Sequence, residues 1–213
     1  MKLFLVLPVL AVALTIVAKD PVATDSAQGA ALQAVFKPKA NVDIQGTISF
    51  KAAKNGTVIV DVDLENLPEE GGPFPYHIHQ SPVPSDGNCT GTKAHLNPYN
   101  GTAKFTDPAD LEVGDLAGRH GNLTLGTQKI EYADEYISLN SLDKAYFGGL
   151  SVVIHDHLNN RLTCANITAK DEDSHSLSLA SPLASVSSKP SNSAEKMSFG
   201  VVAAAAAAAA YIL

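Results

Sequence analysis

Basic residues are scarce in this chain of 213 residues, which has 15 Lys and Arg against 22 Asp and Glu. The formal net charge of −7 argues against a nucleic acid as partner, because proteins that bind nucleic acids gather basic residues to neutralise phosphates. The overall charge does not determine the local field around a small site, which depends on the few charges nearest to it.

Long helical periodicity is absent from the central part of the chain, which contains short runs of alternating apolar and polar residues instead. Clusters of Gly, Pro and Asn separate these runs, as turns separate short strands. The pattern predicts an all-β domain, an antiparallel sandwich or barrel, with no long helix. The runs that begin near Val42 and Thr57 are expected to form a hairpin across Asn55-Gly56.

Both ends of the chain have the pattern of processing signals. Residues 1–18 start with one basic residue, continue as an apolar run and end in small residues, which predicts a secretory signal peptide. Residues 199–213 are apolar to the end and follow a Ser- and Pro-rich stalk at 170–198, which predicts a GPI-anchor signal. A tail-anchor helix is the alternative, but the run is short for a span of about 20 residues.

The predicted attachment residue for the anchor is Asn192, with Ser187 or Ser188 as alternatives because the spacer after Asn192 is short. The chain has five N-x-S/T sequons, which in a secreted protein predict a glycosylated surface. They begin at Asn55, Asn88, Asn100, Asn122 and Asn166. Glycans and short loops favour a monomer.

Cysteine is rare: Cys89 and Cys164 are the only two. They lie in the single domain, residues 25–169, that remains once both ends are removed. In an oxidising compartment we expect them to pair, and the chain-entropy model gives such a long closed loop a stabilisation of ~4 kcal/mol. A metal site with cysteine ligands is disfavoured, because it would need both thiolates free.

Histidine supplies the chemical signal. His77 and His79 lie one residue apart in a predicted strand, so their side chains share a face with Cα atoms ~6.5–7 Å apart. His155 and His157 repeat this spacing after an apolar run, and His95 lies in the long segment between residues 80 and 110, beside Cys89. One such pair is most simply a surface feature, but two pairs with a loop histidine in a secreted chain favour a metal site.

A site rich in imidazole and without thiolate suits copper, zinc or nickel. Four imidazole nitrogens fit the tetragonal preference of copper(II), although spacing alone does not select the metal.

Five motifs along residues 30–168 resemble, in order and spacing, those of the Cu/Zn superoxide dismutases. They are "YHIHQ", "GNCTGTKAHLNP", "EVGDL", "GGLSVVIHDH" and "RLTCANI". The resemblance implies an eight-stranded antiparallel Greek-key β-barrel. It also implies that the copper ligands are His77, His79, His95 and His155, that Cys89 and Cys164 form the family's disulfide, and that Arg161 meets the anionic substrate.

The departures from the family pattern concern zinc. Ala103 and Glu112 stand where the family has zinc-binding histidines, and Asp115 alone keeps its type. One histidine with two carboxylates is a poor tetrahedral zinc site. Only residues 158–160 occupy the place of a long charged loop. These departures and the two terminal signals resemble the fungal extracellular copper-only superoxide dismutases, so we expect one copper ion and no zinc.

The resemblance implies an enzyme at the cell surface or cell wall that converts superoxide into dioxygen and hydrogen peroxide. Glu112 is expected to orient His95 and raise its basicity, and Arg161 to attract superoxide with a charge that does not titrate away. The alternative for Glu112 is a solvated loop carboxylate, and the alternative for Arg161 is a surface arginine in a turn. Asp115 is expected to organise its turn by accepting backbone N–H bonds.

Two alternatives remain for the whole chain: a non-catalytic copper-binding cell-wall protein, and a Cu/Zn enzyme with a degraded but occupied zinc site. Three histidines receive no ligand role. His157 is placed at the rim of the site, His120 in a solvated turn, and His175 in the stalk.

Overall fold

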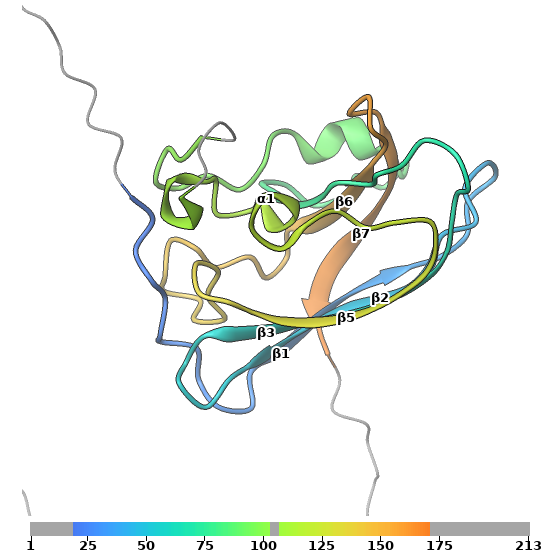
Figure 1. The fold of residues 1–213 in the computed structure, drawn as a ribbon. Helices are drawn as coiled ribbons and strands as arrows, with labels where there is room; N and C mark the ends of the chain where they lie inside the picture. Colours follow the sequence, from blue (N-terminus) through green and yellow to red (C-terminus); the bar gives the residue numbers. More distant parts are fainter. Residues whose placement is uncertain (1–18, 103–106, 171–213) are drawn as a thin grey trace, which may run out of the picture. The chain divides into compact units, whose positions relative to one another are not determined.

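The computed structural model describes residues 19–102 and 107–170 (Figure 1). The strands of this part are β1 (Ala31–Phe36), β2 (Gln45–Ala52), β3 (Val58–Leu67), β4 (Tyr76–His79), β5 (Gly126–Asp134), β6 (Ser151–His155) and β7 (Arg161–Ala169). Its helical segments are η1 (Cys89–Thr92), η2 (Pro108–Asp110) and α1 (Leu116–His120). Among these residues, no helix is long and apolar enough to cross a membrane.

The predictions for the two ends of the chain lie outside the described residues. They are the signal peptide at 1–18, the stalk with Asn192 and His175, and the hydrophobic tail at 199–213. Ala103 also lies outside them.

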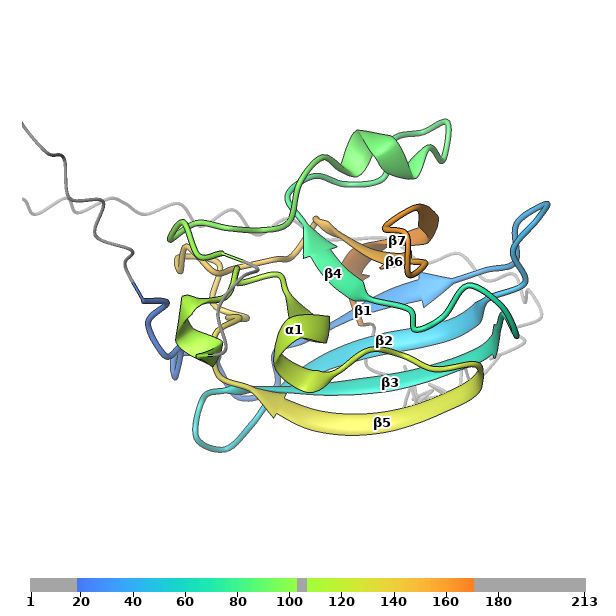
Figure 2. The ribbon, with the colours of Figure 1, turned by 45° about the horizontal axis from the view of Figure 1, so that its top comes forward.

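The strands form one antiparallel sheet in the order β4-β6-β7-β1-β2-β3-β5, which confirms the all-β prediction. The predicted hairpin is present, since all of β2 pairs with residues 58–65 of β3. An isolated antiparallel bridge between Phe74 and Leu123 joins the segments that precede the two edge strands, β4 and β5. The sheet therefore curls toward closure, as Figure 2 shows from above.

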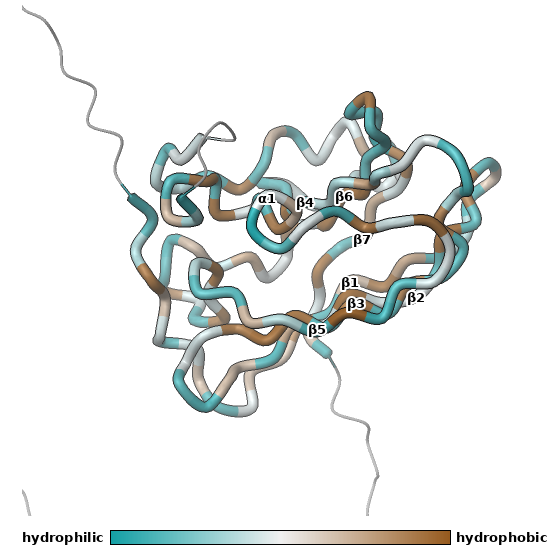
Figure 3. Tube along the Cα trace, in the orientation of Figure 1, coloured by the Kyte–Doolittle hydropathy of each residue, from teal (hydrophilic) through white to brown (hydrophobic). Residues whose placement is uncertain are grey.

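The alternating pattern of β3 explains how the sheet buries its core. Val58, Val60, Val62 and Leu64 are fully buried, while Asp61 is exposed on the other face. Brown, hydrophobic segments recur along β1 and β3 in Figure 3 for this reason. Burying each such side chain stabilises the fold by roughly 1.5–3 kcal/mol.

The described residues form seven strands, so the expected count of eight is not confirmed. Strand β5 ends at Asp134, before the apolar residues of the following segment. The Asp134 carboxylate accepts the backbone N–H groups of Tyr136 and Ile137, at 2.8 and 3.0 Å. These bonds turn the chain, because the two N–H groups are no longer available to a neighbouring strand.

The prediction that His120 is solvated is wrong. Its Nε2 lies 2.8 Å from Asp134 Oδ2, and its ring stacks on Tyr132 with centroids 3.9 Å apart. A residue that ends a short helix gives no sequence signal of this partner, which lies 14 residues later at the end of β5.

A buried ion pair connects the start of the described chain to α1. Arg119 Nη2 donates to Asp20 Oδ2 at 3.0 Å, with side chains only 2% and 0% exposed. The guanidinium also donates to the carbonyls of Leu111 and Val113, on either side of Glu112. Burial raises the pKa of Asp20 to about 6 despite the attraction of Arg119.

Replacing Arg119 by Met should lower the free energy of unfolding by about 3–5 kcal/mol, because it leaves the Asp20 carboxyl buried without a countercharge. The loss should be smaller at pH 5 than at pH 8. A folded pKa above the unfolded one means that the neutral carboxyl predominates at the lower pH, where burial costs less. Chemical denaturation at both pH values measures this.

The double variant Asp20→Asn/Arg119→Met is the matched control and should recover part of the loss. A single variant as stable as the parent at pH 8 would show that the pair contributes nothing.

Candidate metal centre

Three segments meet in a closed ring of main-chain hydrogen bonds. Ile78 N–H donates to Gly114 O at 2.9 Å, Gly114 N–H to Leu96 O at 2.8 Å, and Leu96 N–H to Ile78 O at 2.8 Å. Glycine is required at 114, since a Cβ there would lie 2.2 Å from Ile78 O. The ring places strand β4, the residue after His95, and the turn that carries Glu112 at fixed positions relative to one another.

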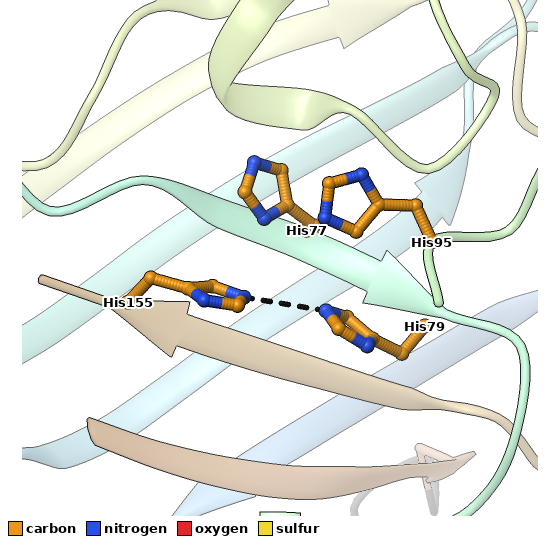
Figure 4. A group of neighbouring side chains, drawn as sticks. All are labelled: His77, His79, His95 and His155. Atoms are coloured by element: carbon orange, nitrogen blue, oxygen red, sulfur yellow. Dashed lines mark hydrogen bonds between the residues drawn. The ribbon is translucent and has the colours of Figure 1, made fainter. Parts of the chain in front are cut away.

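All four predicted ligands come together. His77, His79, His95 and His155 each offer one ring nitrogen, and these four atoms lie within 4.8 Å of one another. Two come from β4, one from the loop that follows η1, and one from the end of β6 (Figure 4). Among the described residues, no other group of three or more His, Cys, Asp or Glu side chains converges in this way.

The β4 pair is oriented by oxygen partners outside the cluster. His79 Nδ1 lies 2.9 Å from Lys93 O, and His77 Nε2 lies 3.4 Å from Asp115 Oδ1. A carbonyl or carboxylate oxygen can only accept, so each of these nitrogens carries the proton. His77 Nδ1 and His79 Nε2 are left as lone-pair donors.

The other two rings follow the same rule. His95 Nδ1 lies 2.5 Å from Glu112 Oε2, and His155 Nδ1 lies 3.3 Å from Asn159 O. This leaves the Nε2 atom of each ring for the cluster, and His155 Nε2 lies 3.3 Å from His79 Nε2. Outer acceptors that fix tautomer and ring orientation are what metal-binding histidines have in proteins.

The burial, hydrogen bonding and pKa values of the rings indicate whether the cluster fits a metal. His77 Nδ1 is buried and has no hydrogen-bond partner, which is costly unless an ion takes its lone pair. Burial and the neighbouring imidazoles lower the pKa of His79 to about 3 and of His155 to about 4; burial also lowers that of His77. Neutral imidazoles without thiolate fit copper, and a site of this composition also accepts zinc or nickel.

Glu112 is more firmly held than the sequence predicted. Its Oε2 accepts from His95, and its Oε1 accepts from Asn97 Nδ2 at 3.2 Å. Asn97 also exchanges two hydrogen bonds with the backbone of Gly101, at 2.8 and 2.9 Å. Asn97 was missed although it lies within a quoted motif, since no local pattern reports a partner fifteen residues away.

Asp115 accepts a backbone N–H bond in its turn, as predicted, and it also contacts His77. It is the N-cap of α1, with Oδ1 accepting from Gly118 N–H at 2.8 Å, and the same oxygen lies near His77 Nε2. Burial alone would raise the pKa of Asp115, but His77 and the Gly118 N–H hold it below its usual value. The carboxylate thus stays ionised beside a metal-ligand candidate.

Cys89 and Cys164 form the predicted disulfide, which joins η1 to β7. The long segment after β4 is accordingly fixed by a covalent bond as well as by the main-chain ring.

Arg161 lies at the mouth of the cluster. It lines an open cleft of about 430 Å³ together with His79, Ala94, His95, Glu112, His155 and Asn159. Nη1 donates to Cys89 O at 2.6 Å and Thr90 O at 2.9 Å, and Nη2 donates to Lys93 O. Within the described part of the chain, Nε–H and one Nη2–H have no acceptor and are available to an anion.

Lys93 has an unusual backbone. Its φ of 65° and ψ of −139° lie in a region that is essentially restricted to glycine and costs a side-chain-bearing residue about 1–3 kcal/mol. Its carbonyl oxygen accepts hydrogen bonds from both His79 and Arg161. Lys93 received no role from the sequence.

The remaining predicted residues lie apart from the cluster. His157 is exposed, beyond the end of β6, with Nδ1 3.0 Å from Gly71 O. The five sequon asparagines are all exposed. Glycosylation of these positions stays a prediction.

Residues 44–195 match the model of the copper/zinc superoxide dismutase family. The chain belongs to that family. The resemblance read from the five motifs is thereby confirmed.

Two proteins of Candida albicans are similar to this chain. The cell surface superoxide dismutase (Cu-Zn) 4 is 53% identical over 169 residues, covering 79% of this chain and 73% of that protein. The cell surface Cu-only superoxide dismutase 5 is 53% identical over 152 residues, covering 71% and 67%. The Cu(II) structure of superoxide dismutase 5 matches with a TM-score of 0.66 and 54% identity, over 67% of this chain and 94% of that one.

Metal analysis of the purified protein should find about one copper and no zinc per chain. The four imidazoles provide one site, and Glu112 and Asp115 are engaged by His95 and His77. Loading with equimolar copper and zinc followed by gel filtration and elemental analysis measures this. Stoichiometric zinc that persists beside copper would instead support a Cu/Zn site.

Proposed function

We propose that this protein is an extracellular superoxide dismutase that works with a single copper ion held by His77, His79, His95 and His155. The observation that carries the proposal is the convergence of four imidazole nitrogens, three of their rings lining an open cleft together with Arg161. The family and the curated relatives, named as superoxide dismutases, favour an enzyme over a copper-storage protein.

Bound copper would supply a centre that alternates between two oxidation states, which zinc cannot do. The overall reaction converts two superoxide anions and two protons into dioxygen and hydrogen peroxide. Arg161 attracts and orients the anion with its two available N–H groups and a charge that is fixed at all relevant pH values.

His95 is the proposed site of proton storage. Its Nδ1–H donates to Glu112, which fixes the ring, and its Nε2, when it does not ligate copper, would take up a proton and pass it to the reduced oxygen species. Its side chain is 22% exposed, so water can resupply the proton. Asn97 keeps the carboxylate in place while the ring changes its protonation state.

The cell-surface names of the relatives support a location outside the cell. We propose that residues 1–18 direct secretion and that the tail at 199–213 is exchanged for a GPI anchor near Asn192. The relatives' names are compatible with an anchor, which would hold the enzyme at the membrane or cell wall as a monomer.

Copper-loaded protein should consume superoxide far faster than spontaneous decay, as followed by stopped-flow absorbance. Replacing Glu112 by Gln should lower the rate per bound copper by about 10–100-fold, because a neutral amide oxygen orients His95 less strongly. Glu69→Gln, which removes an exposed carboxylate elsewhere, is the matched control and should retain the parent rate. A protein that binds copper but leaves superoxide untouched would be a copper buffer.

Replacing Arg161 by Ala should weaken activity without abolishing it, by roughly 10-fold at low ionic strength, because the local attraction for the anion is lost. Arg161→Lys separates charge from structure, since it keeps the charge but not the fork that holds Cys89 O and Lys93 O. Full activity of the Ala variant at low salt would refute the steering role.

A further inference from the structure

The backbone of Lys93 differs from every comparable position in the described part of the chain. Four residues there other than glycine have positive φ: Asn66, Lys93, Asn100 and Asn159. Three are asparagine, which tolerates this conformation better than other side chains. Lysine has no such tolerance, and its ψ of −139° lies outside the small left-handed region that asparagine uses.

The carbonyl of Lys93 does not explain why lysine is present. It accepts from Arg161 Nη2 and lies 2.9 Å from His79 Nδ1, and both contacts are made by the main chain. Glycine would present the same carbonyl without strain, because it has no Cβ. The position therefore retains a strained lysine where the local geometry favours glycine, which indicates a use for the side chain.

The ammonium group is the part that glycine would lack. Lys93 is exposed, and its Nζ makes no hydrogen bond or ion pair within residues 19–102 and 107–170. It lies two residues before His95, and its backbone touches Arg161, so it is anchored at the mouth of the cleft. Since the chain carries a net charge of −7, the field at this mouth depends on the few cations next to it.

We propose that Lys93 guides superoxide into the cleft, as a second cation beside Arg161. This inference rests on the proposed function and adds a residue to it. The ammonium acts through long-range attraction on a small anion, and the strained backbone fixes where the side chain leaves the main chain. The role is that of a steering residue, which raises the rate of encounter and takes no part in electron or proton transfer.

The test compares Lys93→Gln with the parent, both copper-loaded, over ionic strengths from 10 mM to 1 M. We expect the second-order rate constant of the variant to be about 2–3-fold lower at 10 mM and equal to the parent at 1 M, where charges are screened beyond about 3 Å. Lys54→Gln removes the same charge in the turn between β2 and β3, which β7 and β1 separate from β4 and β6. It should keep the parent's salt dependence.

Two further variants separate charge from backbone. Lys93→Gly should raise Tm by about 2–4 °C while showing the rate loss of Lys93→Gln. Lys93→Arg should keep the parent rate at every ionic strength. A Gln variant that follows the parent at low salt, or a Gly variant that is less stable, would overturn the inference; a copper-loaded parent with no activity would instead overturn the proposed function.

Discussion

A ring of three main-chain hydrogen bonds, through Ile78, Leu96 and Gly114, is the constraint on which the site depends. It fixes the mutual position of three segments that are distant in sequence and that carry two histidines, a third histidine and two carboxylates. Because the bonds are made by the backbone, they impose no side chain at these positions except glycine at 114. The ring can therefore hold the geometry while the residues around it determine the metal.

The four rings are oriented by hydrogen bonds to oxygen atoms outside the cluster. Each imidazole gives its outer N–H to an oxygen: carbonyls for His79 and His155, carboxylates for His77 and His95. The two carboxylates are thus used to orient rings, and this is a physical reason why their segment need not hold a second metal. Among the four rings, only His95 combines a carboxylate partner with a side chain that is 22% exposed, and its proposed role in proton transfer rests on this combination.

The sequence predicted those features that are local or repeated. Alternation in β3 and the His-x-His spacing in β4 follow directly from the strand period, and the pairing of two cysteines follows from secretion. The resemblance added Glu112 and Arg161. The sequence could not predict the end of β5 at Asp134, because the Asp134 side chain captures backbone N–H groups there. It could not predict the partner of His120 either, because the same carboxylate reaches that ring only through the folding of the chain. Asn97 and Lys93 were missed because their partners are set by tertiary contacts.

The buried pair of Asp20 with Arg119 has a consequence for maturation. If the leader is removed after residue 18, only one residue separates the new amino terminus from a carboxylate inside the domain. Trimming by two more positions would leave the guanidinium, which supports the carbonyls on both sides of Glu112, without its countercharge. The site of proteolytic processing would then determine whether the secreted protein keeps the ion pair that holds the segment around Glu112.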